Sequence, residues 1–306
     1  MKSKFLLIII ANLCVALSMQ AKVLRVNNVD NSAPYSKIED AVKAAAEGDT
    51  IMLDGSPYSY GTIKLDKRLV LIGNGYDLIA NGIATEAQDA YTYYIEVNAE
   101  GCVLKGLNVT ADVYGGSINV NAPRVIITRC KIAARSTDSY SILMGEGANN
   151  CVIHQNRIRG NIGNSNVRTS EHQITNNLLN NINFRAVDNS YVAYNTSWDR
   201  WGDSAPYSKG TKFEYNIVNY DNFGEGDTEN TYSSNIGANL SSANNENEVK
   251  ELSADLTNRG YGIFAGSDPY VISGVPAGPV IEKLDVPVSA EAGGTMKVSV
   301  KIGETK

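Results

Sequence analysis

The segment with the most distinctive chemistry is Tyr194–Lys209, which reads YNTSWDRWGDSAPYSK. It contains both tryptophans of the chain, interleaved with Asp199, Arg200 and Asp203. Flat aromatic faces stack on the apolar faces of sugar rings, while Arg and Asp side chains hydrogen-bond sugar hydroxyls or carboxylates. We therefore expect a glycan-contacting loop in this segment. Its aromatic residues are Tyr194, Trp198, Trp201 and Tyr207.

Trp198 also has a structural interpretation, which the sequence leaves open. It follows Asn195 by three residues, so it can equally pack beneath a corner of the chain. Upstream, Arg185 and Asp188 offer the same kinds of polar group and extend the candidate site. Arg168 joins them if its strand register places it on the same side. The predicted site therefore combines the loop with these three charged residues.

The acidic loop at 220–230, YDNFGEGDTEN, is a second candidate, because carboxylate oxygens are the ligands that calcium prefers. Its carboxylates are Asp221, Glu225, Asp227 and Glu229. They share one side only if the loop is extended, and a solvated acidic loop is the alternative. Calcium is the only ion that the sequence suggests. Neither His154 nor His172 has the Cys or Asp spacing of a zinc site, so no metal ligands are assigned.

A repeating backbone must position these side chains. Segments such as Ile153–Ile158, IHQNRI, place an apolar residue three positions before a small or amide residue and another two positions after it. The central residue recurs about every 20 residues, which is the signature of a solenoid. The central residues are Leu107, Cys130, Asn156, Asn177, Asn195, Asn216 and Asn235. No helical periodicity accompanies the repeat, so the coils are predicted to be β-strands.

A second short strand lies between most of these centres. The candidates are Tyr94–Val97, Ser117–Val120, Ser141–Met144 and Asn183–Ala186. Several short strands per coil, separated by Asn, Gly and Ser turns, predict an all-β parallel β-helix. Alternation along the strands gives one outward position in each. These outward positions are Glu96, Asn119, Leu143 and Arg185.

The five asparagines among the repeat centres predict a ladder of buried amides. Coils of a parallel β-helix lie about 4.8 Å apart, so equivalent residues stack in columns. Each amide can donate to the coil on one side and accept from the coil on the other. We place these asparagines at a tight corner, where Asn also tolerates left-handed backbone geometry. A lone buried amide would cost roughly 1–3 kcal/mol, whereas stacked amides satisfy one another.

The two ends of the predicted solenoid have their own signals. A short amphipathic helix over about Ser36–Ala46 is expected to cover the open end before the strand Thr50–Leu53. Near the C-terminus, Glu282–Val288 and Thr295–Ile302 alternate in polarity around Ala292–Gly294. This pattern predicts a β-hairpin.

Residues 1–21 read as a secretory signal peptide, because Lys2 and Lys4 precede an apolar run that ends in small residues. Removing these two lysines takes the formal charge from −6 to −8, which argues against a nucleic-acid partner. No later stretch is long enough to span a bilayer. The mature chain keeps the odd set Cys102, Cys130 and Cys151, which we interpret as buried thiols.

The chain resembles the right-handed parallel β-helix proteins of the pectate-lyase-like superfamily. Beside the coil repeat, the entry segment YSKIEDAVKAAAEGDTIMLDGSPY at 35–58 is similar to theirs. The C-terminal segment at 261–302 resembles the tail of secreted β-helix proteins from Bacteroidetes-type bacteria. The resemblance covers most of the mature chain at the level of architecture. It does not include a catalytic motif.

Enzymes of that superfamily abstract a proton beside a uronate carboxylate with an Arg or Lys base, often with calcium. For this chain the resemblance implies Arg185, Arg168 or Arg200 as the base, with carboxylates at Asp188, Asp199 and Asp203. The outward column holds a single carboxylate, Glu96, which is too few for a calcium cage. The Asn-Thr-Asp run and paired Asp residues of the hydrolases are missing. If the protein is an enzyme, a lyase is therefore favoured over a glycoside hydrolase.

The sequence thus predicts a signal peptide at 1–21, a right-handed parallel β-helix at 22–262 and a C-terminal β segment at 263–306. The first functional hypothesis is an exported protein that binds polysaccharide or a cell-surface glycan. The second is a polysaccharide lyase with Arg185, Arg200, Asp199 and Asp203 as catalytic candidates. The third is a surface or scaffold module without glycan contact. Fold analogy alone supports the enzyme hypothesis.

Overall fold

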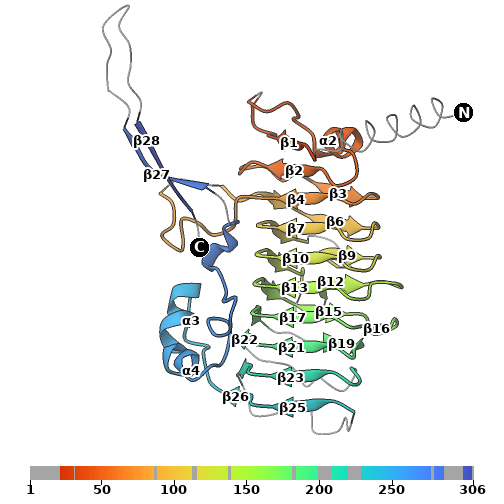
Figure 1. Cartoon of the computed structure of the whole chain (residues 1–306), viewed down its shortest axis with the longest axis vertical. Helices are drawn as coiled ribbons and strands as arrows, with labels where there is room; N and C mark the ends of the chain where they lie inside the picture. Colours follow the sequence, from red (N-terminus) through yellow and green to blue (C-terminus); the bar gives the residue numbers. More distant parts are fainter. Residues whose placement is uncertain are drawn as a thin grey trace, which may run out of the picture.

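The chain winds into stacked coils whose short parallel strands form three sheets along the solenoid, and a C-terminal part lies beside it (Figure 1). The structure is a computed structural model. It describes residues 21–30, 32–85, 88–111, 116–136, 139–180, 184–198, 208–219, 229–276, 279–285 and 299–304. The chain is therefore an all-β parallel β-helix with few helices, as the sequence predicts.

The largest sheet has ten parallel strands. In spatial order they are β1 (Val23–Val26), β2 (Thr50–Leu53), β4 (Val70–Ile72), β7 (Val103–Lys105), β10 (Ile126–Thr128), β13 (Val152–His154), β17 (Gln173–Thr175), β21 (Tyr191–Ala193), β23 (Lys212–Glu214) and β25 (Thr231–Ser233). The middle residue of most of these short strands points into the core. Ile153, Ile174, Val192 and Phe213, for example, are fully buried, whereas the residues on either side of them, except Ala193, are at least partly exposed.

An eight-stranded and a six-stranded sheet complete the coils. The eight-stranded sheet contains β5 (Tyr91–Thr92), β8 (Asn108–Thr110), β11 (Lys131–Ala133), β14 (Arg157–Arg159), β18 (Leu178–Asn180), β22 (Thr196–Ser197), β24 (Ile217–Val218) and β26 (Ile236–Gly237). The six-stranded sheet contains β3 (Thr62–Leu65), β6 (Tyr94–Val97), β9 (Ile118–Val120), β12 (Tyr140–Met144), β15 (Asn161–Gly163) and β19 (Phe184–Arg185). A small sheet pairs β16 (Thr169–Ser170) with β20 (Val187–Asp188).

The predicted outward column is confirmed by the pairing in the six-stranded sheet. Glu96 pairs with Asn119, and Asn119 pairs with Leu143. Gly163 lies between Leu143 and Arg185, because the sequence did not predict strand β15, to which Gly163 belongs. The column therefore follows the predicted order with one coil inserted.

The asparagine ladder is present at the corner between the ten-stranded and eight-stranded sheets. The Nδ2 atoms of Asn156, Asn177, Asn195 and Asn216 each donate to the Oδ1 atom of the next asparagine, at 2.9–3.1 Å. Each Oδ1 also accepts the backbone N–H of the preceding ladder position, as between Asn156 N and Asn177 Oδ1 at 2.9 Å. Each Nδ2 donates a second bond to a carbonyl of the preceding coil. The stacked amides therefore satisfy one another, as predicted.

One detail of that prediction is wrong. The left-handed residue of each corner is not the ladder asparagine but the residue before it. These residues are Gly106, Arg129, Gln155, Asn176, Tyr194, Tyr215 and Ser234, all with φ between 52° and 65°. The asparagine must aim its amide inward along the stack, so the sharp reversal of the chain falls one position earlier. We call these residues the corner column; apart from Gly106, which has no side chain, they turn their side chains outward or toward the C-terminal part.

The N-terminal end is covered as expected. Helix α2 (Ile38–Ala44) buries Ile38 and Ala41 against the first coils, within the predicted range. Strand β1 precedes it and pairs with β2, so the solenoid begins one strand earlier than Thr50. Capping in this way covers strand edges and core side chains that would otherwise be open to water.

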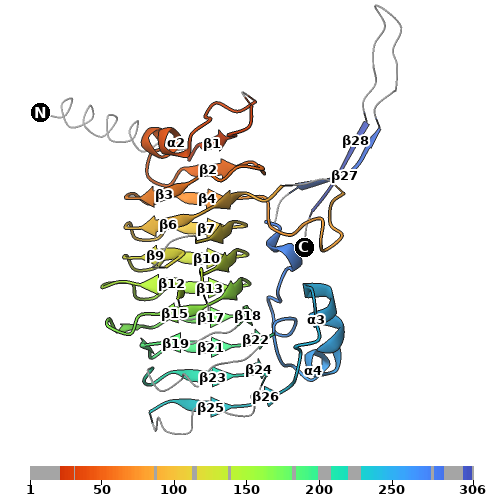
Figure 2. The same cartoon turned by 180° about the vertical axis from the view of Figure 1, so that it is seen from behind.

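The C-terminal part contains elements that the sequence interpretation lacked. After β26 the chain forms α3 (Glu246–Leu252), α4 (Ala254–Asn258) and the 3-10 turn η2 (Ile272–Gly274), which lie beside the stacked coils (Figure 2). Strands β27 (Pro279–Asp285) and β28 (Ser299–Glu304) then form the predicted antiparallel hairpin. The domain division at 262 and 263 stays a prediction.

Two smaller expectations concern the thiols and the membrane. Cys102, Cys130 and Cys151 are buried and free, as predicted. Burial raises the pKa of Cys130 to about 12 and that of Cys151 to about 11, so both are neutral hydrophobic groups.

Among the residues that the structure describes, no helix is long and apolar enough to cross a membrane. Residues 1–20 of the predicted signal peptide at 1–21 lie outside the described residues, so the signal peptide stays a prediction.

Candidate functional site

A groove lies on the outer face of the ten-stranded sheet, where the C-terminal part approaches it. Its volume is about 350 Å³. It is lined by Val152, His154, Gln173, Thr175, Asn176, Tyr191, Tyr194, Gly266, Ser267 and Asp268. The first seven come from β13, β17, β21 and the corner column, because alternation turns the outer residues of each strand away from the core. Three successive coils therefore build one wall of the groove.

The corner column fixes the opposite lip. The Asn176 amide nitrogen donates to the carbonyls of Ile263 and Ala265, both at 3.0 Å. The Gln155 amide nitrogen donates to Asp268 Oδ1 at 2.8 Å and to the carbonyl of Pro269 at 2.5 Å. Both amides are buried, so water competes little for these hydrogen bonds. The segment that carries Gly266, Ser267 and Asp268 is therefore held against the solenoid at two coils.

Two tyrosines give the groove an aromatic surface. Tyr191 and Tyr194 are half-buried, and each shows part of its ring to the groove. Tyr194 stacks on Tyr215 of the next coil, with ring centroids 5.1 Å apart and planes 10° apart. Partial burial raises the pKa of Tyr194, and that of Tyr191 to about 12, so both hydroxyls stay neutral and can donate hydrogen bonds. The groove thus pairs flat aromatic faces with neutral donors.

His154 connects the two walls of the groove. Its Nε2 atom lies 3.1 Å from Asp268 Oδ2, and its Nδ1 atom lies 2.8 Å from Thr175 Oγ1. Burial lowers the pKa of His154, and the neighbouring Asp268 only partly opposes that effect. The imidazole is therefore neutral near pH 7, with hydrogen-bond partners on both nitrogens.

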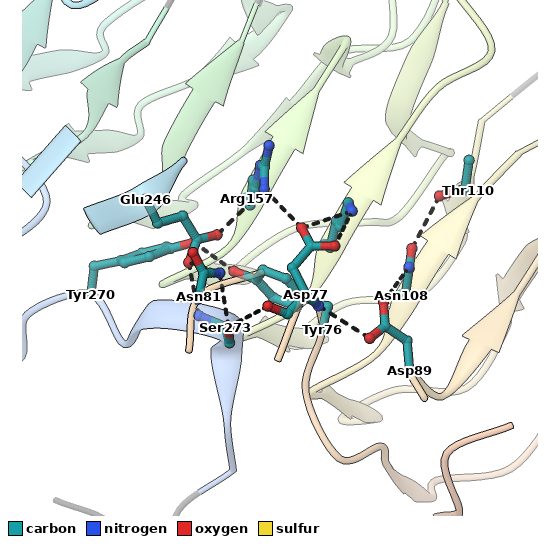
Figure 3. A network of polar contacts seen from close by, with 11 residues as sticks. Tyr76, Asp77, Asn81, Asp89, Asn108, Thr110, Arg157, Glu246, Tyr270 and Ser273 are labelled. Carbon is teal, nitrogen blue, oxygen red and sulfur yellow. Dashed lines mark hydrogen bonds and ion pairs between the residues drawn. The ribbon is translucent and has the colours of Figure 1, made fainter. Parts of the chain in front are cut away.

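A second polar cluster holds the C-terminal part on the eight-stranded sheet (Figure 3). Asp77 accepts from Lys131 Nζ at 2.7 Å and from Arg157 Nη1 at 2.9 Å. Asp89 accepts the Asp77 backbone N–H at 3.1 Å and the Asn108 amide at 2.7 Å. Desolvation raises the pKa of Asp89, whereas Asp77 lies between two cations.

The buried end of this cluster is centred on Glu246. Its carboxylate accepts from Tyr270 Oη at 2.9 Å and from the Ser273 backbone N–H at 2.8 Å, and it lies 3.8 Å from Arg157. Tyr270 in turn bonds Tyr76 at 2.5 Å. Burial raises the pKa of Glu246. These contacts join the chain near Tyr76, helix α3 and turn η2, so we assign the cluster to docking of the C-terminal part.

The structure brings together two of the predicted charged residues. Strand β16 pairs with β20 so that Ser170 lies opposite Asp188, and the Arg168 side chain, two residues earlier, reaches the same carboxylate. Arg168 Nε and Nη2 donate to the two carboxylate oxygens at 2.6 and 2.5 Å, and Asp188 Oδ1 also accepts the Lys209 N–H at 2.9 Å. Arg168 therefore lies on the same side as Asp188, while the role of both residues in a glycan site stays a prediction. Arg185 projects from the six-stranded sheet, and none of these three residues lines the groove.

Among the predicted aromatic contacts, Tyr194 lines the groove and Trp198 does not. Trp198 is 8% exposed and packs against Leu240, Val249 and Ile263 of the C-terminal part. Its Nε1 donates to the Ala243 carbonyl at 2.9 Å. Because Trp198 is buried, its ring cannot stack on a sugar. The predicted sugar contact is therefore wrong, and Trp198 packs between the solenoid and the C-terminal part.

We expect Trp198→Phe to lower the free energy of unfolding by about 1–2 kcal/mol, because the Ala243 carbonyl loses its partner and the smaller ring leaves space. Urea denaturation followed by circular dichroism measures this change. Glycan binding by the folded variant should match that of the wild type. Unchanged stability together with lost binding would restore the sugar-contact interpretation.

Several predicted residues lie outside the described part of the chain. They are Asp199, Arg200, Trp201, Asp203, Tyr207, Asp221, Glu225 and Asp227. Glu229, the remaining carboxylate of the acidic loop, lies 3.7 Å from Lys209 Nζ. Within the described ranges, no group of three or more His, Cys, Asp or Glu residues has the arrangement of a metal site. Calcium binding therefore stays a prediction about the acidic loop.

Sequence reasoning missed most of the groove. Gln173, Thr175 and Tyr191 flank the apolar centres of their strands, and His154 precedes its ladder asparagine by two positions. Strand alternation, which gives the outward column of the six-stranded sheet, places all four side chains outward in the ten-stranded sheet as well. Asp268 carried no such signal, because its position depends on how the C-terminal part folds back.

Comparison with known proteins adds little to this geometry. No family model matches the chain, and no curated protein matches it. Among solved structures, it is similar to the pectin methylesterase PemA from Erwinia chrysanthemi, with a TM-score of 0.43 and 10% sequence identity. The match covers 74% of this chain and 91% of the other. A likeness at this level carries no information about activity.

Proposed function

We propose that the protein binds a polysaccharide in the groove of the ten-stranded sheet. The observation that carries this proposal is the presence of Tyr191 and Tyr194 in one groove with polar groups from three coils. Sugar rings offer apolar faces to aromatic side chains and hydroxyls to polar ones. Both kinds of contact are available here within one wall.

The polar groups suit neutral hydroxyls. Gln173 is exposed and carries an amide that both donates and accepts, and Asp268 is an exposed acceptor on the facing lip. The Tyr194 ring stacks on Tyr215 and lies against Gly266 of the facing lip, so that both neighbours hold it in place where it lines the groove. A ring that is already ordered loses little entropy on binding. We infer that the ligand is an extended chain crossing several coils.

We place this function outside the cytoplasm. The proposal rests on the N-terminal sequence, in which Lys2 and Lys4 precede an apolar run in the manner of a signal peptide. The acidic net charge of the chain makes a polyanionic nucleic-acid partner unfavourable.

Tyr194→Ala is expected to weaken polysaccharide binding at least tenfold, because it removes the stacking face while leaving the backbone path intact. Affinity electrophoresis against a panel of neutral and uronate-rich polysaccharides, followed by calorimetry with the best ligand, measures the effect. Tyr58→Ala is the matched control, because Tyr58 is 63% exposed and lies at the N-terminal end of the solenoid. Equal affinities for the two variants would contradict the proposed groove.

A further inference from the structure

The groove contains a continuous chain of three side chains that polysaccharide binding alone does not require. Thr175 Oγ1 lies 2.8 Å from His154 Nδ1, and His154 Nε2 lies 3.1 Å from Asp268 Oδ2. Gln155 holds the other carboxylate oxygen of Asp268 at 2.8 Å. All three side chains of the chain line the groove. A hydroxyl, an imidazole and a carboxylate in this order form the arrangement of an activated nucleophile.

The protonation of His154 follows from its partners. An ionised Asp268 can only accept, so it selects the imidazole tautomer that carries its proton on Nε2. Nδ1 then presents a lone pair to Thr175. The Thr175 carbonyl lies 3.2 Å from Nδ1 but has no proton to give, so the hydroxyl at 2.8 Å is the donor. The Thr175 O–H bond therefore points at a base.

We propose that the groove is also an acyl-transfer site, in which Thr175 is the nucleophile and His154 the general base for an ester carried by a bound sugar, such as an O-acetyl group. Asp268 is a positioning residue, since it acts on His154 and not on the ester. This inference rests on the proposed glycan binding, which supplies the sugar. The triad logic depends on geometry and not on the order of the residues in the chain.

The reaction balances with water as the only co-reactant. Thr175 Oγ bonds to the ester carbonyl carbon while its proton moves to His154 Nδ1. The bond between that carbon and the sugar oxygen then breaks, and the sugar oxygen takes the proton from Nδ1. A water molecule attacks the acyl-threonine by the same route, which releases the carboxylic acid and restores the Thr175 hydroxyl.

The surroundings of these residues favour this chemistry. Burial lowers the pKa of His154, so the imidazole is an unprotonated base near neutral pH. Thr175 is half-buried on the groove wall, which leaves its hydroxyl within reach of a ligand. Gln173, two residues earlier on the same strand, is exposed in the groove and supplies an amide donor for the developing oxyanion.

The test is acetate release from acetylated oligosaccharides and from 4-nitrophenyl acetate by the whole protein. We expect Thr175→Val, which keeps the shape of the side chain, and His154→Gln each to lower the rate about 100-fold or more. Thr175→Ser should retain activity, because it keeps the hydroxyl. Intact-mass measurement should show an acyl adduct on the wild type that is missing from Thr175→Val.

The pH dependence of acetate release by Asp268→Asn distinguishes a positioning role of Asp268 in the reaction from a purely structural one. Asp268 raises the pKa of His154, opposing burial and the Arg129 charge, so its neutralisation should move the acid limb of the rate profile to lower pH. No release by the wild type, or equal release by Thr175→Val, would overturn the inference. If the wild type releases no acetate but still binds deacetylated glycan, the acyl-transfer inference fails while the proposed glycan binding remains supported. The effect of Tyr194→Ala on affinity tests glycan binding and does not test acyl transfer.

Discussion

Replacing Asn177 by leucine is expected to lower the free energy of unfolding, by about 1–3 kcal/mol for each buried polar group left without a partner, although leucine adds apolar surface. The Asn177 Oδ1 atom accepts from the backbone N–H of Asn156 at 2.9 Å and from its amide at 3.0 Å. The Asn177 Nδ2 atom donates to the Ile153 carbonyl at 2.9 Å and to Asn195 Oδ1 at 3.0 Å. The substitution therefore leaves polar groups without partners in two neighbouring coils at once.

The cost is high because no water replaces the lost amide. Asn156, Asn177 and Asn195 are all 0% exposed, so the orphaned groups remain desolvated. Urea denaturation monitored by circular dichroism measures the change. Asn166→Leu is the control, since Asn166 is an exposed asparagine of the same region and its loss should change stability by less than about 0.5 kcal/mol. Similar losses in both variants would mean that the ladder contributes no special stability.

Acidification is expected to destabilise the fold through His172. This residue is 1% exposed, and burial lowers its pKa to about 4, with Asp188 only partly opposing the shift. Its Nδ1 accepts the Cys151 backbone N–H at 3.3 Å, and its Nε2 lies 3.0 Å from Thr169 Oγ1. Protonation would turn Nδ1 into a donor facing another donor. The folded protein therefore binds this proton much more weakly than the unfolded chain.

The sign follows from the lowered pKa. Well above pH 6.5 the imidazole is neutral in both states, and its contribution to stability is fully present. Between pH 6.5 and about 4 the unfolded chain takes up the proton while the folded protein does not, so stability falls with pH. The loss should reach about 3 kcal/mol near pH 4.

Unfolding free energies of the wild type and of His172→Gln, measured at intervals from pH 7 to pH 4, test this expectation. Glutamine can accept from Cys151 and donate to Thr169 but does not titrate here, so the difference between the two proteins should change with pH. His154→Gln is the comparison, because His154 is the only other histidine of the chain. A wild-type curve parallel to that of His172→Gln would assign acid sensitivity to other groups.

Periodicity made the solenoid predictable. A chain that stacks coils must repeat its apolar and amide positions at nearly equal intervals, so local sequence carries the fold over most of its length. Asn156 to Asn235 reveal both the coil length and the ladder, and the alternation in Tyr94–Val97 reveals the outward column. The left-handed corner positions were harder, because Arg129 and Tyr194 bear side chains that give no hint of a positive φ.

The groove is only partly visible in the sequence. The sequence indicates Tyr194 because it lies beside a cluster of aromatic and charged residues, whereas the predicted residues Arg168 and Asp188 pair with each other outside the groove. Trp198 had two interpretations, and only its burial under the C-terminal part decided between them. Local composition identifies side chains that can meet a sugar, but it does not show which of them another segment covers.

The sequence by itself determined the coil, the amide ladder, the capped N-terminal end and the unpaired buried thiols, because each depends on spacing along the chain or on neighbouring coils. The tertiary structure alone decided that Asp268 meets His154, 114 residues earlier in the chain. That contact depends on how the C-terminal part docks through Glu246, Arg157 and Asp77. The sequence of a non-repeating segment contains no periodic pattern from which its packing position could be predicted.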